Sequence, residues 1–267
     1  MPELPEVEVT RRRLERELVG KSFKQVVLRV GKLRLPVPAE LTKTLPGLKL
    51  QAIARRGKYL LFDCEVGWLL VHLGMTGFLR LLRGTPPPGK HDHIDFLFDD
   101  GQLLRFHDPR KFGVVAWLAG DPLQHPLLAD IGPEPLTGAF DGRYLFGVTR
   151  GRKVAVKQLI MNSAVVAGVG NIYANEALFR AGIRPDRDAG ALTLQECTEL
   201  ASAIREVLEG SIGEGSTWRV AEETVAYYPQ ALKVYGRGGE PCRSCGEPLA
   251  ETRLGGRSTV FCRSCQE

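Results

Sequence analysis

The chain has 267 residues, of which 43% are hydrophobic and 25% charged, and its formal net charge is +5. This composition indicates a globular protein with room for two moderate domains, and it excludes a disordered or fibrous chain. No apolar run approaches the roughly 20 residues of a membrane helix, and charges throughout the first twenty residues exclude a signal peptide. We therefore expect a cytosolic protein.

The first predicted element is a helix over residues 5–19, followed by Gly20 as a stop. Its apolar residues recur on one face: Leu4, Val7, Leu14 and Leu18. Between Thr10 and Arg34, nine Lys and Arg residues stand against two acids. This excess favours a polyanionic partner, although a solvated helix face explains the same pattern.

From residue 22 to 118 the pattern changes to short β-type runs, separated by turn signals such as Asp99-Asp100-Gly101. The runs include residues 23–30, 59–63, 68–72, 78–82, 94–98 and 114–118. This rhythm predicts antiparallel sheets packed as a sandwich. The prolines within 122–135 predict that the first domain ends there, before a connector that reaches about residue 150.

Helices are predicted for the second half. A capping box of Thr193 and Glu196 begins a helix that ends at Gly210. Its apolar stripe consists of Leu194, Cys197, Leu200, Ala201, Ile204, Val207 and Leu208. Before it, a glycine-containing turn at 167–171 opens a helical run over 172–181. The backbone N–H groups at such a start suit a phosphate, although a turn without a ligand explains the glycines as well.

Four of the six cysteines form two Cys-x-x-Cys pairs separated by sixteen residues: Cys242, Cys245, Cys262 and Cys265. This spacing predicts a closed four-thiolate site for one structural zinc ion. Two disulfides in a secreted tail are the alternative, which the missing signal peptide disfavours. Between the pairs we expect a β-hairpin that turns at Gly255-Gly256, with Arg257 near its tip. A finger of this kind either binds a phosphate or serves only as a packing module.

The N-terminus contains candidate catalytic residues. If the initiator methionine is removed, Pro2 presents a secondary amine. A free α-amino group is roughly one-seventh neutral at pH 7, whereas a lysine is neutral only about once in 2,500. A helix start beside the amine lowers its pKa further, and Glu3 is a possible proton donor. We therefore predict a nucleophile that forms an iminium, although a Met-Pro-Glu start often has no function.

Several motifs carry a family resemblance when they are taken together. They are Pro2-Glu3-Leu4-Pro5-Glu6-Val7, Arg56-Gly57-Lys58, His72-Leu73-Gly74-Met75-Thr76-Gly77, His91-Asp92-His93, Asp108-Pro109-Arg110-Lys111-Phe112-Gly113, Gly168-Val169-Gly170-Asn171-Ile172-Tyr173 and the four-cysteine finger. In this order, from residue 2 to 265, the chain closely resembles formamidopyrimidine-DNA glycosylase.

The resemblance implies an α+β multidomain fold. We expect an N-terminal antiparallel β-sandwich with a flanking helix (1–131), a connector (132–152), a helix-two-turn-helix DNA-binding domain (153–234) and a zinc finger with a β-hairpin (235–267). It also implies the substrate, namely oxidised purines in duplex DNA, chiefly 8-oxoguanine opposite cytosine and ring-opened formamidopyrimidines. Abasic sites would be cut by β,δ-elimination. A bacterial monomer is implied, cytoplasmic and held at the nucleoid by DNA, with no membrane partner and no redox or organic cofactor.

Roles for individual residues also follow from the resemblance. Pro2 looks like the nucleophile, Glu3 the acid that assists sugar-ring opening, Lys58 the residue for β-elimination and Arg257 the one for δ-elimination. Three residues look like those that fill the space left by an extruded nucleotide: Met75, Arg110 and Phe112. The remaining positions, near phosphates or the lesion, are His91, Arg152, Lys153, Lys157, Asn171 and Tyr173.

Without the motif, Met75 and Phe112 are ordinary core residues and Arg110 forms a surface salt bridge. His72 is expected to be a structural histidine. The loop between Arg219 and Val234 is shorter than expected from the family and lacks glycine between Val220 and Val234. Two alternatives stay open: a glycosylase for oxidised pyrimidines of the endonuclease VIII type, and a protein that binds damaged DNA without catalysis.

Overall fold

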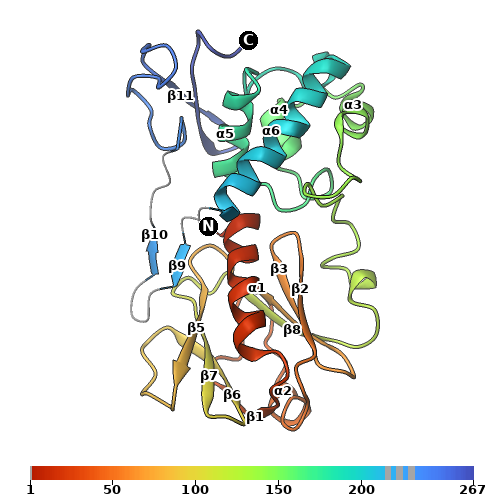
Figure 1. Ribbon diagram of the computed structural model, residues 1–267, viewed down its shortest axis with the longest axis vertical. Coiled ribbons are helices and arrows are strands. Elements are labelled where there is room, and N and C mark those ends of the chain that lie inside the picture. Colours follow the sequence, from red (N-terminus) through yellow and green to blue (C-terminus); the bar gives the residue numbers. More distant parts are fainter. Residues whose placement is uncertain (1, 214–217, 221–224, 228–231) are drawn as a thin grey trace. The chain divides into compact units, whose positions relative to one another are not determined.

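The computed structural model describes residues 2–213, 218–220, 225–227 and 232–267. By their contacts, the described residues fall into two compact units (Figure 1). The first contains residues 2–129 with the short strands β9 (Trp218–Val220) and β10 (Val225–Tyr227). The second contains residues 130–213 and 232–267. Within the described ranges, no helix is long and apolar enough to cross a membrane.

Helix α1 (Leu4–Leu18) confirms the first predicted element. Its apolar face is buried as expected, at Leu4, Val7, Leu14 and Leu18. Glu3 is the N-cap and forms a capping box with Glu6, whose Oε2 accepts a hydrogen bond from the Glu3 backbone N–H at 2.8 Å. Gly20 then adopts a φ of +91°, which only glycine adopts readily, and the helix ends there.

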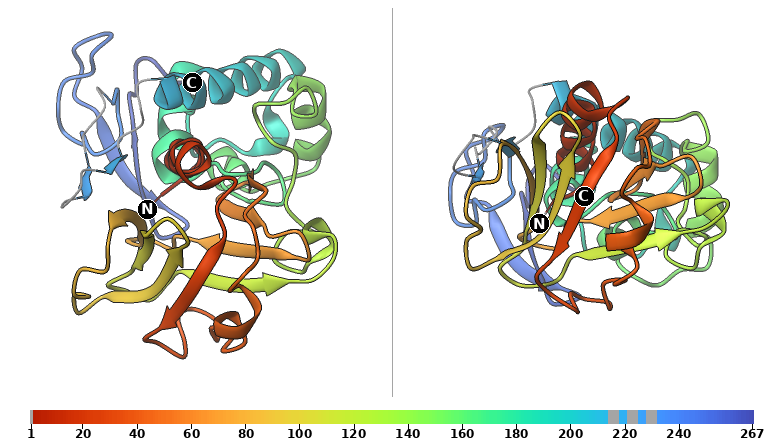
Figure 2. Two further views of the ribbon diagram at one scale, coloured as in Figure 1. Left: turned by 60° about the horizontal axis from the view of Figure 1, so that its bottom comes forward. Right: turned by 90° about the horizontal axis from the view of Figure 1, so that it is seen from below.

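The first unit confirms the predicted sandwich of antiparallel sheets. In the described part of this unit, one four-stranded sheet has the order β1-β6-β7-β5 and the other β2-β3-β4-β8. Their strands are β1 (Phe23–Leu28), β2 (Ala52–Arg56), β3 (Tyr59–Asp63), β4 (Trp68–His72), β5 (Phe78–Arg83), β6 (Asp92–Phe98), β7 (Gln102–His107) and β8 (Val114–Leu118). Figure 2 draws them in red to yellow-green. A common core joins both sheets, α1 and the short helix α2 (Leu41–Thr44).

Strands β2 and β7 are absent from the sequence prediction. β2 ends in two arginines, and β7 carries Arg105 in its interior, so neither shows a clean apolar alternation. Arg105 is nevertheless buried, because its guanidinium bonds both carboxylate oxygens of Asp95 at 2.7 and 2.8 Å. Asp99-Asp100-Gly101 forms the expected turn between β6 and β7.

Helix α3 (Gly142–Thr149) lies in the stretch that the sequence assigns to a connector, after the short 3₁₀ turn η1 (Pro122–Gln124). It forms there because Asp141 caps it, accepting from the Tyr144 N–H at 2.7 Å, and because it packs on α6. Helices α4 (Val156–Ile160), α5 (Asn171–Arg180) and α6 (Leu194–Gly213), with the 3₁₀ turn η2 (Ala189–Ala191), complete the described helical part.

The capping box predicted for α6 is confirmed. Glu196 accepts from the Thr193 N–H at 2.8 Å, and Thr193 accepts from the Glu196 N–H at 3.2 Å. The predicted apolar stripe of α6 is wrong at its first residue, because Leu194 is 44% exposed. Leu194 lies in the first turn, before the part of the helix that packs on α3 and α5. The helix also continues past Gly210, where Ser211 and Ile212 are buried.

The hairpin of the finger is confirmed as β11 (Ala250–Leu254) and β12 (Arg257–Phe261). Leu254 pairs with Arg257, and the connecting Gly255 and Gly256 have φ of +55° and +73°. Positive φ at both central residues is what a tight two-residue hairpin of this type requires. The expected shortened loop between Arg219 and Val234 lies largely outside the described residues; of it the structure describes the end of β9, β10 and the segment from 232.

Candidate active site and metal centre

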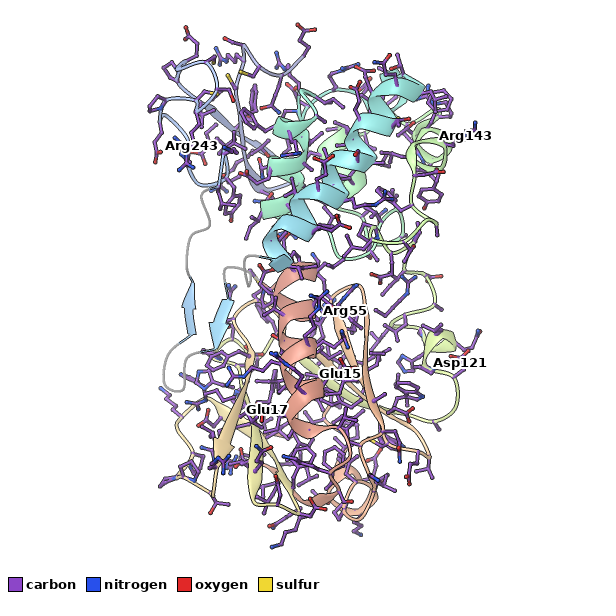
Figure 3. The ribbon with its side chains drawn as sticks, in the orientation of Figure 1. Glu15, Glu17, Arg55, Asp121, Arg143 and Arg243 are labelled. Atoms are coloured by element: carbon purple, nitrogen blue, oxygen red, sulfur yellow. The ribbon has the colours of Figure 1, made fainter. Side chains whose placement is uncertain are left out.

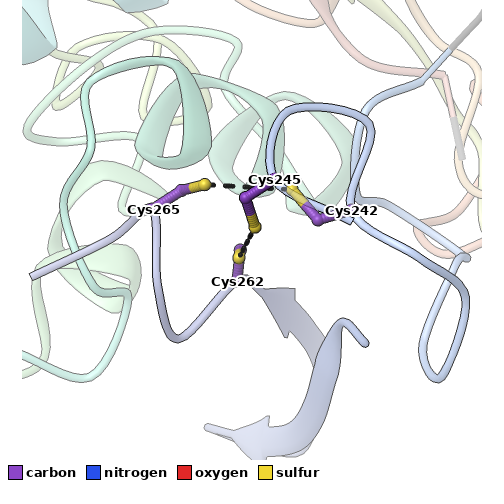
Figure 4. A group of neighbouring side chains, drawn as sticks. All are labelled: Cys242, Cys245, Cys262 and Cys265. Atoms are coloured by element: carbon purple, nitrogen blue, oxygen red, sulfur yellow. Dashed lines mark hydrogen bonds between the residues drawn. The ribbon is translucent and has the colours of Figure 1, made fainter. Parts of the chain in front are cut away.

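The four cysteines of the finger converge, as Figure 4 shows. Their sulfur atoms all lie within 4.8 Å of one another, with 3.9 Å between Cys242 and Cys265 and 3.5 Å between Cys245 and Cys262. Tetrahedral coordination at Zn–S lengths of about 2.3 Å places sulfurs about 3.8 Å apart. The donor set and spacing therefore fit one structural zinc ion. Four thiolates leave no open coordination position, so this ion does not activate water.

Side chains of the helices hold the finger hairpin by its second strand. Lys157, which is only 1% exposed, donates from Nζ to the Ser258 carbonyl at 2.8 Å and to the Thr259 hydroxyl at 2.6 Å. Asn171, the first residue of α5, donates from Nδ2 to the same Ser258 carbonyl at 3.0 Å. The residue next to Ser258 is Arg257, which is exposed. Its backbone is thus fixed while its guanidinium side chain remains accessible.

Further along α5, Asn175 and Glu176 also bind the finger segment. Asn175 Oδ1 accepts from the Val260 N–H at 2.9 Å. The buried carboxylate of Glu176 accepts from three consecutive backbone N–H groups, Lys233, Val234 and Tyr235, at 2.8 to 2.9 Å. Glu176 is absent from the residues predicted from the sequence; the signal that could have identified it is an acidic residue inside an otherwise buried helix.

A small cavity of about 220 Å³ adjoins the tip of the hairpin. Residues of α4 and the turn after it line one side, and Leu254, Gly255 and Arg257 line the other. Gln158 touches the tip so closely that a Cβ on Gly255 would lie 2.6 Å from its Nε2. The polar lining and the arginine suit an anionic group.

Pro2 is buried and directly precedes the N-cap of α1. The N–H groups at a helix start carry partial positive charge, which disfavours a second positive charge on a nearby amine. An amine at this position is therefore more easily kept neutral and nucleophilic. Glu3, also buried, carries the nearest carboxylate along the chain.

Lys58 lies in the tight turn between β2 and β3, after Gly57, whose φ is +55°. Arg55 holds this turn, because its Nη1 donates to the Gly57 carbonyl at 3.0 Å. Arg55 in turn binds Glu8 of α1 at 3.0 Å, and Figure 3 labels it beside that helix. Burial alone would raise the pKa of Glu8, but hydrogen bonds from Arg11, Arg12 and Arg55 lower it to about 2. Glu8 and Arg55 thus connect the Lys58 turn to α1, and both are absent from the residues predicted from the sequence.

The structure brings Met75, Arg110 and Phe112 together. Met75 and Phe112, with Arg34, His72 and Gly74, line a largely apolar cavity of about 370 Å³. The Arg110 guanidinium lies 4.6 Å from the centre of the Phe112 ring, and Phe112 is 42% exposed. An arginine stacked on an exposed aromatic ring is not the surface salt bridge considered from sequence, and Phe112 is not a core residue.

His72, at the end of β4, accepts a hydrogen bond at Nδ1 from the Gly74 N–H at 3.0 Å. Its ring lies 4.7 Å from that of Tyr59. Burial, with the positive charges of Lys58 and Arg34, lowers the pKa of His72 to about 4. It is therefore neutral at pH 7, in keeping with the structural role expected.

The remaining candidates differ in accessibility. Arg152 and Lys153 are exposed between α3 and α4, and His91 is half-buried beside His107, with ring centres 5.8 Å apart. Tyr173 is 1% exposed, and its hydroxyl lies 2.7 Å from that of Ser211 in α6. Tyr173 and Lys157 thus form their hydrogen bonds within the second unit, whereas the side chains of the other candidates are at least partly exposed to solvent.

Family models match most of the chain. That of the formamidopyrimidine-DNA glycosylase N-terminal domain matches residues 1–115, and that of its H2TH domain matches residues 131–222. A zinc finger found in Fpg and IleRS matches residues 239–267. The match to the finger agrees with the clustered cysteines.

Relatives match over the full length. The formamidopyrimidine-DNA glycosylase of Geobacter metallireducens is 68% identical over 266 residues, covering 100% of both chains, and that of Pelobacter propionicus is 65% identical over 267 residues with the same coverage. The crystal structure of the MutM (Fpg) protein from Thermus thermophilus is 37% identical, with a TM-score of 0.86 over 99% of this chain and 98% of that one. A complex of Lactococcus lactis Fpg with DNA containing an abasic site is 34% identical, with a TM-score of 0.91 over 99% of each chain. The chain belongs to the formamidopyrimidine-DNA glycosylase family.

Proposed function

We propose that this chain excises oxidised purines from duplex DNA and then cleaves the strand, with Pro2 as the nucleophile. The observation that carries the proposal is the place of Pro2, directly before the N-cap of a helix in a member of this family. Relatives in the family are seen with DNA that contains a ring-opened guanine lesion or an abasic site. Paired 8-oxoguanine and formamidopyrimidine lesions are the expected substrates.

In the proposed reaction the Pro2 nitrogen attacks C1′ of the damaged nucleotide. The N–C1′ bond forms, the bond to the base breaks and the base leaves with a proton, while Glu3 protonates O4′ as the sugar ring opens. The resulting iminium acidifies the 2′ hydrogen. Lys58 assists its removal, which expels the 3′ phosphate, and Arg257 assists the second elimination, which expels the 5′ phosphate. Water then releases the sugar fragment from Pro2.

The base is proposed to leave the stack before it is cut. Extrusion costs a few kcal/mol. Phe112 wedges the stack, Met75 fills the space beside it and Arg110 bonds the unpaired cytosine. Met75 and Phe112 line one cavity and Arg110 stacks on the Phe112 ring, which supports this role.

We propose phosphate contacts for His91, Arg152, Lys153 and Asn171, which position the backbone without reading sequence. Lys157 and Tyr173 are assigned an indirect role, because both are buried and bonded within their unit. Lys157 fixes the finger strand that carries Arg257, and Tyr173 fixes α5 against α6.

The domain boundaries at 131, 152 and 234 belong to the same proposal, as do a monomeric state and a cytoplasmic location at the nucleoid. The family models that begin at 131 and 239 support the boundaries at 131 and 234, whereas the H2TH model covers residues 131–222 and runs across residue 152.

Borohydride trapping tests the nucleophile. The protein is incubated with duplex DNA containing 8-oxoguanine opposite cytosine, reduced, digested and mapped by peptide mass spectrometry. We expect an adduct on the N-terminal Pro2 peptide, both in the wild type and in Lys58→Arg, which keeps the charge but forms no imine under these conditions.

Each of the other possible results leads to a different conclusion about the function. An adduct at Lys58 keeps the enzyme class and overturns the nucleophile. Excision of thymine glycol without excision of 8-oxoguanine indicates the endonuclease VIII type. Tight binding without base release or strand cleavage indicates a protein that only binds lesions.

A further inference from the structure

Asp108 directly follows β7 and is fully buried, with 0% exposure. Its carboxylate accepts from the backbone N–H of Gly113 at 2.8 Å and of Arg110 at 3.3 Å. It also accepts from the Thr76 hydroxyl at 3.3 Å. One carboxylate therefore binds two loops: the 74–77 turn, which carries Met75, and the 108–113 loop, which carries Arg110 and Phe112.

The main chain of Asp108 is anchored as well. Its carbonyl accepts from His93 Nε2 at 2.8 Å, and because a carbonyl can only accept, Nε2 carries the proton. Its N–H donates to the His91 carbonyl at 3.0 Å. Asp108 is thus fixed to β6, next to His91, before its side chain meets the two loops.

Glycines allow the loops to approach this closely. A Cβ on Gly74 would lie 2.6 Å from the Phe112 carbonyl carbon and 2.6 Å from the Gly113 nitrogen. A Cβ on Gly77 would lie 3.3 Å from the Asp108 Cβ, and 2.3 Å from the Leu73 carbonyl oxygen within its own turn. Such distances are possible only without side chains, so the two loops pack backbone against backbone around Asp108.

We propose that Asp108 is the positioning residue that joins the two loops into one rigid insertion unit. This inference rests on the proposed function, in which Met75, Arg110 and Phe112 enter the stack together. Two acceptor oxygens on a short side chain let Asp108 bind both loops at once. Loops that moved independently would lose the register between Met75 in one loop and Arg110 and Phe112 in the other.

The Thr76→Val variant tests the proposal with the smallest change, because valine has the same shape and lacks the hydroxyl. Single-turnover rates are measured on duplexes with 8-oxoguanine opposite cytosine and on the same duplex with a preformed abasic site. We expect about a tenfold loss on the base-containing lesion and a much smaller loss on the abasic site, which has no base to extrude. The preference for cytosine over adenine opposite the lesion should fall as well.

Thr76→Ser is the matched control, because it keeps the hydroxyl and should stay within about twofold of the wild type. Asp108→Asn is the second variant; its amide presents a donor to one of the loops, and we expect the same selective loss, larger than about tenfold. Urea unfolding identifies a variant that fails to fold.

Several results would overturn the inference. Equal losses on both substrates would mean that Asp108 supports only the fold. Unchanged rates in Thr76→Val would mean that the loops are not joined through this carboxylate. A rate in Thr76→Ser as low as that of Thr76→Val would mean the same. If the wild type forms no adduct and excises no 8-oxoguanine, the proposed function fails first and the positioning role falls with it.

Discussion

His72 illustrates how one side chain depends on its surroundings. In the sequence it is a lone histidine beside a strand, whereas in the structure its Nδ1 accepts the Gly74 N–H and its pKa is lowered to about 4 by burial and two nearby cations. The neutral ring thus holds the beginning of the turn that carries Met75. Protonation at Nδ1 would break this hydrogen bond.

The lowered pKa of His72 predicts how the stability of the protein depends on pH. A histidine whose folded pKa lies below its ordinary value stabilises the protein at neutral pH, and this contribution is lost as the pH falls from 6.5 towards 4. Between pH 7 and pH 5 we expect the wild type to lose about 1 to 2 kcal/mol more than His72→Asn, whose amide oxygen still accepts from Gly74. Urea titrations at both pH values measure the difference; equal losses would contradict the lowered pKa.

At the scale of elements, the loops at one end of the sandwich are ordered by close packing. The 74–77 turn follows β4 and the 108–113 loop follows β7, strands that belong to different sheets. The loops meet because both sheets share one core and because glycine stands at the contact. A side chain at Gly74 would push them apart.

Alanine substitutions at two glycines with similar backbone conformations distinguish the cost of backbone strain from the cost of steric overlap. Gly74 has φ +71°, and a Cβ there would meet backbone atoms at 2.6 Å, whereas Gly84 has φ +68° and a Cβ there would meet nothing within 4 Å. We expect Gly84→Ala to cost about 1 kcal/mol of unfolding free energy from strain alone. Gly74→Ala should cost about 1–3 kcal/mol more from overpacking. Similar losses in urea unfolding would show that the loops can separate at little cost.

At the scale of the whole molecule, the finger depends on metal more than on its own core. Within the described residues, the buried cluster of the finger consists of Val234, Cys242, Leu249, Val260 and Cys262, two of which are metal ligands. A core of this size cannot fold by itself. Zinc and the bonds from Lys157, Asn171, Asn175 and Glu176 supply the rest.

Removal of zinc should therefore unfold the finger without unfolding the sandwich. Cys265→Ser should bind less than one zinc per chain and lose at least about a hundredfold in hydrogen-exchange protection along β11 and β12, because structural zinc contributes about 10 kcal/mol to such modules. Strands of the first unit should keep their protection. Cys197→Ser, a cysteine in α6 outside the cluster, is the control and should retain zinc. Unchanged protection in Cys265→Ser would show that the helices alone hold the hairpin.

Local patterns were predicted well and distant contacts were not. The capping box of α6 and the two-glycine turn of the finger depend on residues two to four positions apart, and both are confirmed. Leu194 fits the same helical period but is exposed, because periodicity does not say where the packing partner begins. Glu8, Arg55, Asp108 and Glu176 each bind at least one residue far along the chain, and no spacing indicated those contacts.

The sequence by itself determined α1, the strands of the sandwich other than β2 and β7, the zinc ligands and the family, because each depends on short spacings or on motifs in a set order. Only the tertiary structure decided that Lys157 binds the finger from a buried position, that Arg55 holds the Lys58 turn and that Asp108 joins two loops. Such contacts depend on how strands pair and helices pack, which brings together residues that are distant in the chain.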